Sequence, residues 1–321
     1  MIRLGLIRNP KSTRNKGGAG GDLREQAAHL LGFYFAEPAT PEELAETLAD
    51  FARNEVGIVV VDGGDGTVRE VLTALPKAYG DENLPAVSIL ASGKTNLIAA
   101  DVGTSGHGMK GFSRLMENAR NGTLGSHIQR RPVLEARWDD DSHAPVRGTF
   151  LGAAAFTKAT ALAQEKVHAK GFNNNAAVAL TLAGTLYRTL FGNDPDRLLD
   201  GEPMTVVPDG SNSPQGNRFL FLATTLHRLV MGLWPFWGNG EKPIRYLDIS
   251  AHPERLSRAV LPLMKGKPTD WMLADGYRSG MASEIRMELT RPFIMDGELF
   301  EPGPGGVVRL STPAVIDYVV P

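Results

Sequence analysis

From Ile2 to about Gly122, short apolar runs alternate with segments of helical spacing. Three of the apolar runs have the length of strands: residues 4–7, 57–61 and 87–90. In the segments between them, apolar residues recur every three or four positions, as on one face of a helix. This order of strands and helices predicts an α/β domain with a parallel sheet.

One helix start is marked clearly by the run Thr-Pro-Glu-Glu at residues 40–43. Thr40 can cap the helix, Pro41 suits the first helical position, and the two glutamates face the positive end of the helix dipole. The residues Leu44, Leu48 and Phe51 then form one apolar stripe. We therefore expect a helix that packs this stripe against the sheet.

After about residue 126 the pattern changes to short alternating strands and turns, which predicts a mostly β region. The predicted strands cover residues 128–138, 146–156, 204–207 and 218–226. Two helical segments interrupt them, at residues 157–168 and 176–191. The Asp-Gly-Ser-Asn-Ser-Pro run at residues 209–214 supplies turn formers and predicts a hairpin loop.

The sequence therefore predicts two domains, which a length of 321 residues allows. Residues 1–126 are expected to form an α/β domain. Residues 127–321 are expected to form a β-rich, sandwich-like domain, with the extreme C-terminus free to return to the first domain. The boundary rests on the change of period alone, because no repeat or low-complexity linker separates the halves.

Composition excludes several classes of protein. Hydrophobic residues make up 42% and charged residues 22%, so the chain is globular, and a net charge of −2 gives no sign of a nucleic-acid partner. The absence of cysteine excludes disulfides, thiolate metal sites and thiol nucleophiles, and makes reducing cytoplasm the expected location. The seven histidines form no metal-binding pair, and the Gly-x-Ser-x-Gly elbow of many esterases is missing.

The most informative motif is a Gly-Gly-Asp-Gly-Thr run at residues 63–67, which follows the strand at residues 57–61 after Asp62. Its glycines, Gly63, Gly64 and Gly66, allow backbone N–H groups to approach an anion, and a helix start adds a partial positive charge. A carboxylate at Asp65 would repel a phosphate unless it binds a metal or accepts a proton. The alternative is a structural turn in which Asp65 is a helix N-cap.

Two companion loops favour the binding site. An Asn-Pro-Lys-Ser run follows the first strand at residues 9–12, and Ala-Ser-Gly-Lys-Thr-Asn follows the third at residues 91–96. In a parallel sheet all three loops emerge at the carboxyl ends of strands, where open α/β sheets bind ligands. A true P-loop is disfavoured, because its first glycine would fall at Ser88, inside a strand.

With a late Asp-Gly-Glu at residues 296–298, these loops resemble the diacylglycerol kinase catalytic-domain superfamily. The matching features are Asn9-Pro-x-Ser12, the Gly63–Thr67 loop, Gly93-x-x-Asn96-x-x-Ala99, and Asp296-Gly-Glu298. The superfamily includes sphingosine, ceramide and bacterial lipid kinases, with NAD kinase a more distant relative. The resemblance covers nearly the whole chain, and the four motifs occur in the family's order.

This resemblance implies an α/β nucleotide domain, a β-rich domain, and an ATP site in the cleft between them. It implies ATP contacts from residues of all three loops: Asn9, Lys11, Ser12, Gly63, Gly64, Gly66, Thr67, Gly93 and Asn96. Lys11 and Arg14 are suitable cations for phosphate, although two exposed basic loop residues explain them almost as well. The third loop departs from the family pattern, because Ala91 replaces proline and Lys94 stands where threonine is usual.

Phosphoryl transfer to a hydroxyl needs positioning, Mg²⁺ and a base. We assign Asp296 as the general base and a metal ligand, and Glu298 as a ligand of Mg²⁺ or of the phosphate network. Asp65 is the competing base, since related lipid kinases are described with the base in the glycine-rich loop. The sequence leaves this choice open. An isolated Asp-Gly pair would instead favour a hairpin turn with solvated acids.

A lipid acceptor requires apolar surface near the cleft. The candidates are the aromatic segment at residues 231–237 and the helical segment at residues 176–191, although both also fit ordinary buried elements. Lys158, Lys166 and Lys170 are candidates for contact with anionic headgroups, or simply for a solvated helix face. No run of about 20 apolar residues is present, so we expect peripheral contact of a cytoplasmic protein with a membrane.

The sequence thus predicts an ATP- and Mg²⁺-dependent lipid kinase acting on a diacylglycerol-like or ceramide-like hydroxyl. Residues 241–248 replace the family's frequent Asp-Asp-Gly-Leu-Leu-Asp stretch, which keeps ceramide and sphingoid bases open as acceptors. One alternative is a soluble kinase resembling NAD kinase. Another, motivated by Lys94, is a non-catalytic regulator that binds a nucleotide or lipid. A homodimer is also left open.

Overall fold

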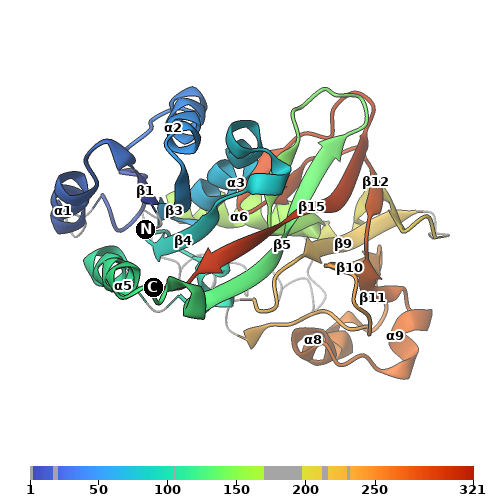
Figure 1. The fold of residues 1–321 in the computed structure, drawn as a ribbon. Helices are drawn as coiled ribbons and strands as arrows, with labels where there is room; N and C mark the ends of the chain where they lie inside the picture. Colours follow the sequence, from blue (N-terminus) through green and yellow to red (C-terminus); the bar gives the residue numbers. More distant parts are fainter. Residues whose placement is uncertain (1–2, 17–20, 105, 170–196, 212–215, 230–231) are drawn as a thin grey trace.

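The computed structural model describes residues 3–16, 21–104, 106–169, 197–211, 216–229 and 232–321. An N-terminal α/β half and a C-terminal β-rich half are joined through one connected network of hydrogen-bonded strands (Figure 1). Both halves were expected from the change of period near residue 126.

The N-terminal half is built on four parallel strands in the order β2-β1-β3-β4. Their bounds are β1 (Arg3–Arg8), β2 (Phe35–Ala36), β3 (Val56–Gly63) and β4 (Ala86–Ala91). The three strands expected from apolar runs are confirmed. The order reverses between β1 and β3, and ligands of open α/β sheets bind at such a switch point, beyond the carboxyl ends of the strands.

Helices cover both faces of this sheet (Figure 1). One face packs against α1 (Gly21–Leu31) and α5 (Gly108–Asn121), and the other against α2 (Pro41–Arg53), α3 (Asp65–Tyr79) and α4 (Leu97–Asp101). Because side chains alternate along a strand, Ile58 and Val60 face the first group while Val59 and Val61 face the second.

The predicted start of α2 is confirmed. The Thr40 hydroxyl accepts a hydrogen bond from the Glu43 backbone N–H at 3.2 Å, and Pro41 is the first helical residue. Leu44, Leu48 and Phe51 are the buried residues of the helix.

The C-terminal half contains eleven strands and three helices within the described residues. The strands are β5 (Ile128–Trp138), β6 (Val146–Gly148), β7 (Phe150–Ala154), β8 (Glu202–Pro208), β9 (Asn217–Thr224), β10 (Ile244–Ser250), β11 (Tyr277–Ala282), β12 (Ile285–Leu289), β13 (Phe293–Met295), β14 (Glu298–Phe300) and β15 (Val307–Val319). The helices are α6 (Ala155–Ala169), α8 (Leu256–Lys265) and α9 (Asp270–Ala274). Short 3-10 helices lie at Gly32–Tyr34, Asp81–Asn83, Leu124–His127 and Leu198–Asp200.

These strands enclose a second core, as expected for a sandwich-like half. Its buried side chains come from many strands of this half. They include Trp138, Leu151, Phe221, Phe293 and Leu310, from β5, β7, β9, β13 and β15. The last strand, β15, runs antiparallel to β5 and then pairs in parallel with β4, with Tyr318 opposite Val87. The C-terminal strand therefore joins the sheet of the N-terminal half.

One local prediction needs correction. The run at residues 146–156 is not one strand, because β6 and β7 are interrupted at Thr149 and α6 begins at Ala155. Part of the predicted hairpin loop, residues 212–214, lies outside the described residues. The strands on either side of it, β8 and β9, pair antiparallel at Glu202 and Pro203, whereas most of β8 pairs with β12. The predicted helix at residues 176–191 lies outside the described residues.

Candidate functional site

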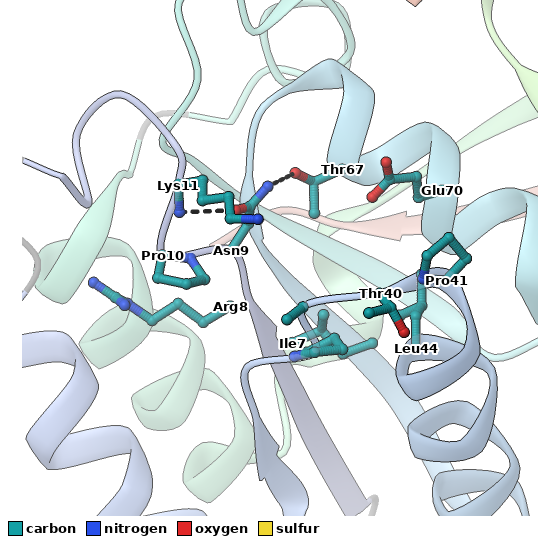
Figure 2. A pocket seen from close by; sticks show the side chains of 12 residues that line it. Ile7, Arg8, Asn9, Pro10, Lys11, Thr40, Pro41, Leu44, Thr67 and Glu70 are labelled. Atoms are coloured by element: carbon teal, nitrogen blue, oxygen red, sulfur yellow. Dashed lines mark hydrogen bonds between the residues drawn. The ribbon is translucent and has the colours of Figure 1, made fainter.

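The first two predicted loops meet at the switch point of the sheet. The Asn9 side-chain amide donates to the Thr67 hydroxyl at 2.8 Å, and its carbonyl oxygen accepts from the Lys11 backbone at 2.9 Å (Figure 2). The Asn9 backbone N–H donates to the Asp62 carbonyl at 2.9 Å. Ser12, in the same loop as Asn9, is buried, and its backbone N–H donates to the Asn9 carbonyl at 3.1 Å. A polar link thus joins the end of β1 to the first turn of α3.

The third loop packs directly on the second. A Cβ atom added to Gly64 would lie 2.9 Å from the Cα of Gly93, so these two backbones are in close contact. Within the loop, Asn96 accepts from the Gly93 N–H at 2.8 Å and donates to the Gly93 carbonyl at 3.0 Å. Asn96 itself has a left-handed backbone, with φ of 51°. Glycine is therefore required at positions 64 and 93 for the loops to approach.

Two cavities share the first turn of α3. The smaller, of about 190 Å³, lies beside the ends of β1 and α2; its lining includes Arg8, Asn9, Lys11, Thr40, Thr67 and Glu70 (Figure 2). The larger, of about 590 Å³, lies between the two halves. Its N-terminal wall includes Gly64, Asp65, Gly66, Lys94 and Thr95. Its C-terminal wall includes Phe150, Phe156, Leu222, Leu229, Leu233, Pro235 and Asp296.

Asp296 is buried at a tight turn between β13 and β14. Met295 pairs with Glu298, and the two turn residues, Asp296 and Gly297, have φ of 46° and 90°, as a type I′ turn requires. The hairpin expected for an Asp-Gly pair is therefore formed. The alternative in which both acids of the turn are solvated is wrong for Asp296, because only 9% of this residue is exposed.

The Asp296 carboxylate is held by three hydrogen bonds. Oδ2 accepts from the Thr149 backbone at 2.8 Å, while Oδ1 accepts from the Thr149 hydroxyl and from the Phe150 backbone, both at 3.0 Å. Burial, and secondly the charge of Asp65, raise the pKa of Asp296 to about 7, although these hydrogen bonds lower it. With a pKa of about 7, this carboxyl group populates both its protonated and its ionised form near neutral pH.

Asp65 caps a helix, but not the helix that it begins. The N-cap of α3 is Gly64, whereas the Asp65 carboxylate accepts from the Ile98 backbone at 3.1 Å, at the start of α4. Burial raises the pKa of Asp65, while hydrogen bonds from the first backbone N–H groups of α4 lower it. The capping alternative thus has a real structural basis, and the same carboxylate also lines the larger cavity.

Glu298 and Asp296, the two acids of this hairpin, have different hydrogen-bond partners. Its Oε2 accepts from the buried Arg69 side chain at 2.8 Å, and the Arg69 guanidinium lies over the Phe300 ring. In this structure Glu298 is therefore paired with Arg69, and the sharing of one metal ion by Asp296 and Glu298 stays a prediction. Among the described residues no cluster of three or more His, Cys, Asp or Glu side chains is arranged to hold a metal ion.

The aromatic segment proposed for lipid contact is largely packed. Phe236 is buried and Trp234 and Trp237 are partly buried, while Leu233 and Pro235 line the larger cavity. Lys158 lies 3.8 Å from Glu202 in an ion pair. Met231 and Lys170 lie outside the described residues, and the side chain of Lys166 is not described. Along the described parts of the chain, no helix combines the length and apolar character needed to span a bilayer.

Sequence reasoning missed several residues of the site. Thr149 and Phe150, which hold Asp296, gave no signal, because their role depends on a hairpin far along the chain. Gly148 was also missed, although a Cβ atom there would collide with the Asp296 carboxylate. Thr40 was considered only as a helix cap, and it also lines the smaller cavity.

Comparisons with known proteins agree with this architecture. Residues 3–126 match the family model of the diacylglycerol kinase catalytic domain. A crystal structure described as a "putative diacylglycerol kinase" from Bacillus anthracis strain Sterne aligns with 14% identity and a TM-score of 0.61, covering 99% of this chain and 97% of that chain. A structure of a diacylglycerol kinase from the same strain aligns with 15% identity and a TM-score of 0.56, with the same coverage of both chains.

At these identities the structural likeness concerns the fold. A comparison with curated protein sequences finds no significant match. The smaller cavity and the three loops that meet at the switch point lie almost entirely within the matched N-terminal residues. The resemblance expected from the loop motifs is thus confirmed: residues 3–126 match the family model of the diacylglycerol kinase catalytic domain, and the fold of the whole chain is like that of such proteins.

Proposed function

We propose that this protein is a lipid kinase that transfers the γ-phosphoryl group of ATP to a hydroxyl group of a lipid. The observation that carries the proposal is the larger cavity, which combines the glycine-rich loop and Asp296 with seven apolar side chains. To phosphorylate a lipid, one site must hold phosphate groups at a polar end and the alkyl chains of the lipid against an apolar wall. The matched catalytic-domain family supports the same activity.

In this proposal the nucleotide is bound by the N-terminal loops. Backbone N–H groups at Gly64 and Gly66, at the positive end of α3, would hold the phosphates. The nucleoside would occupy the smaller cavity, beside Thr40 and Asn9. Mg²⁺ neutralises phosphate charge when it is bound, and it would be held mainly by phosphate oxygens and water, as is usual for this ion.

Asp296 is proposed as the general base. As the acceptor oxygen forms its bond to the γ-phosphorus, the bond from that phosphorus to the β,γ-bridging oxygen breaks and ADP leaves. The hydroxyl proton passes to the Asp296 carboxylate. A pKa of about 7, raised by burial and by Asp65, suits a base near neutral pH. The Thr149 and Phe150 hydrogen bonds would orient the carboxylate towards the acceptor.

The apolar wall favours a lipid over the polar dinucleotide of NAD kinase. Phe150, Phe156 and Leu222 belong to the C-terminal half and offer no hydrogen-bonding side-chain groups to ribose or phosphate. A buried polar ligand without partners loses binding energy. A diacylglycerol, a ceramide or a sphingoid base each presents a primary hydroxyl with alkyl chains, and all three fit this chemistry.

The decisive experiment incubates the purified protein with γ-labelled ATP, Mg²⁺ and, separately, diacylglycerol, ceramide, sphingosine and NAD. Label in the organic phase is the expected result. Label on NAD would instead support a soluble NAD-kinase-like activity. Binding of ATP without transfer to any acceptor would support a non-catalytic regulator.

Replacing Gly148 by Ala is expected to lower kcat by about tenfold, because the added methyl group displaces the general base from its orienting donors. The KM for ATP should change little, since Gly148 lines neither cavity. Gly125→Ala is the matched control, because a Cβ atom there would meet nothing within 4 Å. Equal kcat values for the two variants would show that the orientation of Asp296 does not limit turnover.

A further inference from the structure

Helices α8 and α9 leave an apolar surface uncovered on the C-terminal half, next to β10 and β11 (Figure 1). Their inner sides are packed into a core through Leu256, Ala259 and Met272. On the outer side three large apolar residues are exposed: Leu261 by 59%, Met264 by 45% and Leu273 by 68%. Of the eight large apolar residues exposed in the described chain, these three lie on the two short helices, and together they are called the apolar patch.

Basic residues flank this patch. Arg258, Leu261 and Lys265 are spaced three and four positions apart, so they lie on one face of α8. Lys267 comes next after Gly266, the C-cap of the helix. Between the start of α8 and the end of α9, three cations therefore accompany one carboxylate, Asp270. An amphipathic helix with cations beside its apolar stripe is typical of a protein that lies on an anionic membrane.

The patch is physically connected to the larger cavity. The Trp234 backbone N–H donates to the Met264 carbonyl at 3.0 Å, and Trp234 and Phe236 pack in the same core as the inner side of α8. Leu233 and Pro235, the two neighbours of Trp234 in the sequence, line the cavity. One short segment thus forms the wall of the cavity on one side and supports α8 on the other.

We propose that the outer face of α8 and α9, defined by Arg258, Leu261, Met264, Lys265, Lys267 and Leu273, docks on a bilayer that contains anionic lipids. The apolar side chains enter the headgroup region, and the cations meet lipid phosphates. The inference rests on the proposed function in one respect, that the larger cavity receives the lipid acceptor. Docking then holds this cavity beside the membrane that supplies the acceptor.

A bilayer fits this surface better than a second copy of the chain. A symmetric dimer through the same face would bring Arg258, Lys265 and Lys267 of each copy towards those of the other, and like charges across an interface oppose association. Anionic headgroups complement these cations, and acyl chains accept the three apolar side chains without a shaped partner surface.

The test is co-sedimentation of the full chain, without nucleotide, with vesicles of phosphatidylcholine and phosphatidylglycerol or of phosphatidylcholine alone. Wild-type protein should bind the anionic vesicles more strongly. Lys265→Glu with Lys267→Glu should weaken that binding by about tenfold or more, because each cation near the surface adds to the attraction. Leu261→Glu with Leu273→Glu should weaken binding to a similar extent.

The matched control is Leu30→Glu with Phe33→Glu, which alters two residues of the N-terminal half that are 48% and 62% exposed. Binding of the control should equal that of wild type, and all variants should melt at the wild-type temperature. An equal loss in the control, no loss in either test variant, or no vesicle binding by wild type would overturn the proposal. So would a wild-type dimer that the Leu261 and Leu273 substitutions dissociate.

Turnover of a water-soluble short-chain diacylglycerol separates this inference from the proposed function. The docking variants should phosphorylate that acceptor at the wild-type rate, because it needs no membrane. A wild-type protein that binds anionic vesicles but phosphorylates no acceptor would contradict the kinase function and leave membrane docking standing.

Discussion

Replacing Asp296 by Asn is expected to lower kcat by about 10²-fold or more, because the amide cannot accept the hydroxyl proton during phosphoryl transfer. Asn keeps the size of the side chain and one oxygen acceptor. Of the three donors from Thr149 and Phe150, some will face the new NH₂ group instead. Thermal melting should therefore be measured beside turnover, so that loss of fold is not taken for loss of chemistry.

The pH dependence decides which carboxylate is the base. A base must be ionised, so kcat/KM should rise with pH through about 7, the pKa to which burial and the Asp65 charge raise Asp296. Asp65→Asn removes one cause of that raised pKa and should move the rise to lower pH while preserving turnover. If Asp65 is the base instead, Asp65→Asn should abolish turnover, and Asp296→Asn should leave an active enzyme.

Glu298→Gln is the matched control for Asp296→Asn. It changes the other acid of the same hairpin, whose side chain is 56% exposed and paired with Arg69. Gln keeps a side-chain oxygen that can accept from the buried Arg69, so turnover should stay within a few-fold of wild type and the free energy of unfolding within about 1 kcal/mol. A loss of turnover as large as that of Asp296→Asn would contradict this expectation and show that Glu298 takes part in the reaction.

Replacing Gly66 by Ala is expected to abolish measurable ATP binding while leaving the fold intact. A Cβ atom at this position would meet nothing within 4 Å in the protein. In the first turn of α3, alanine should even raise the free energy of unfolding, by up to about 1 kcal/mol. Glycine is therefore not required there by the fold, whereas close approach of a phosphate to the backbone would require it.

Gly93→Ala provides the contrasting result. Its methyl group would run into the backbone at Gly64, so two loops must separate. We expect a loss of stability of about 1–3 kcal/mol together with loss of ATP binding. Calorimetric titration with ATP and thermal melting of both variants distinguish a binding effect from a packing effect. Wild-type ATP affinity in Gly66→Ala would remove the glycine-rich loop from the proposed phosphate site.

The loops of the N-terminal half could be predicted from the sequence, because their structure depends on residues that are adjacent in the chain. A buried strand followed by glycines and a helix start commonly folds as a strand, a tight loop and a helix. Parallel strands then bring their carboxyl ends to one edge of the sheet. The contact between Asn9 and Thr67 follows from that arrangement. The Asp-Gly pair at residues 296 and 297 likewise predicted its turn, because both positions adopt positive φ.

The surroundings of Asp65, Asp296 and Glu298 could not be predicted from the sequence in the same way. The Asp296 turn is local, but its burial depends on Thr149 and Phe150, nearly 150 positions earlier in the chain. Asp65 begins α3 yet caps α4, because the second and third loops pack against each other. Glu298 looked like a partner of Asp296 by spacing, and the position of Arg69 gives it a different partner.

The sequence by itself determined the α/β order of the first half, the β-rich second half, and the three loops at the edge of the parallel sheet, since each depends on periodicity or on residues adjacent in the chain. Only the tertiary structure decided that Asp65 and Asp296 line one cavity with apolar side chains of the C-terminal half. The physical reason is that burial and charge proximity, which set the pKa of a carboxylate and the polarity of a cavity, arise between segments that are distant along the chain.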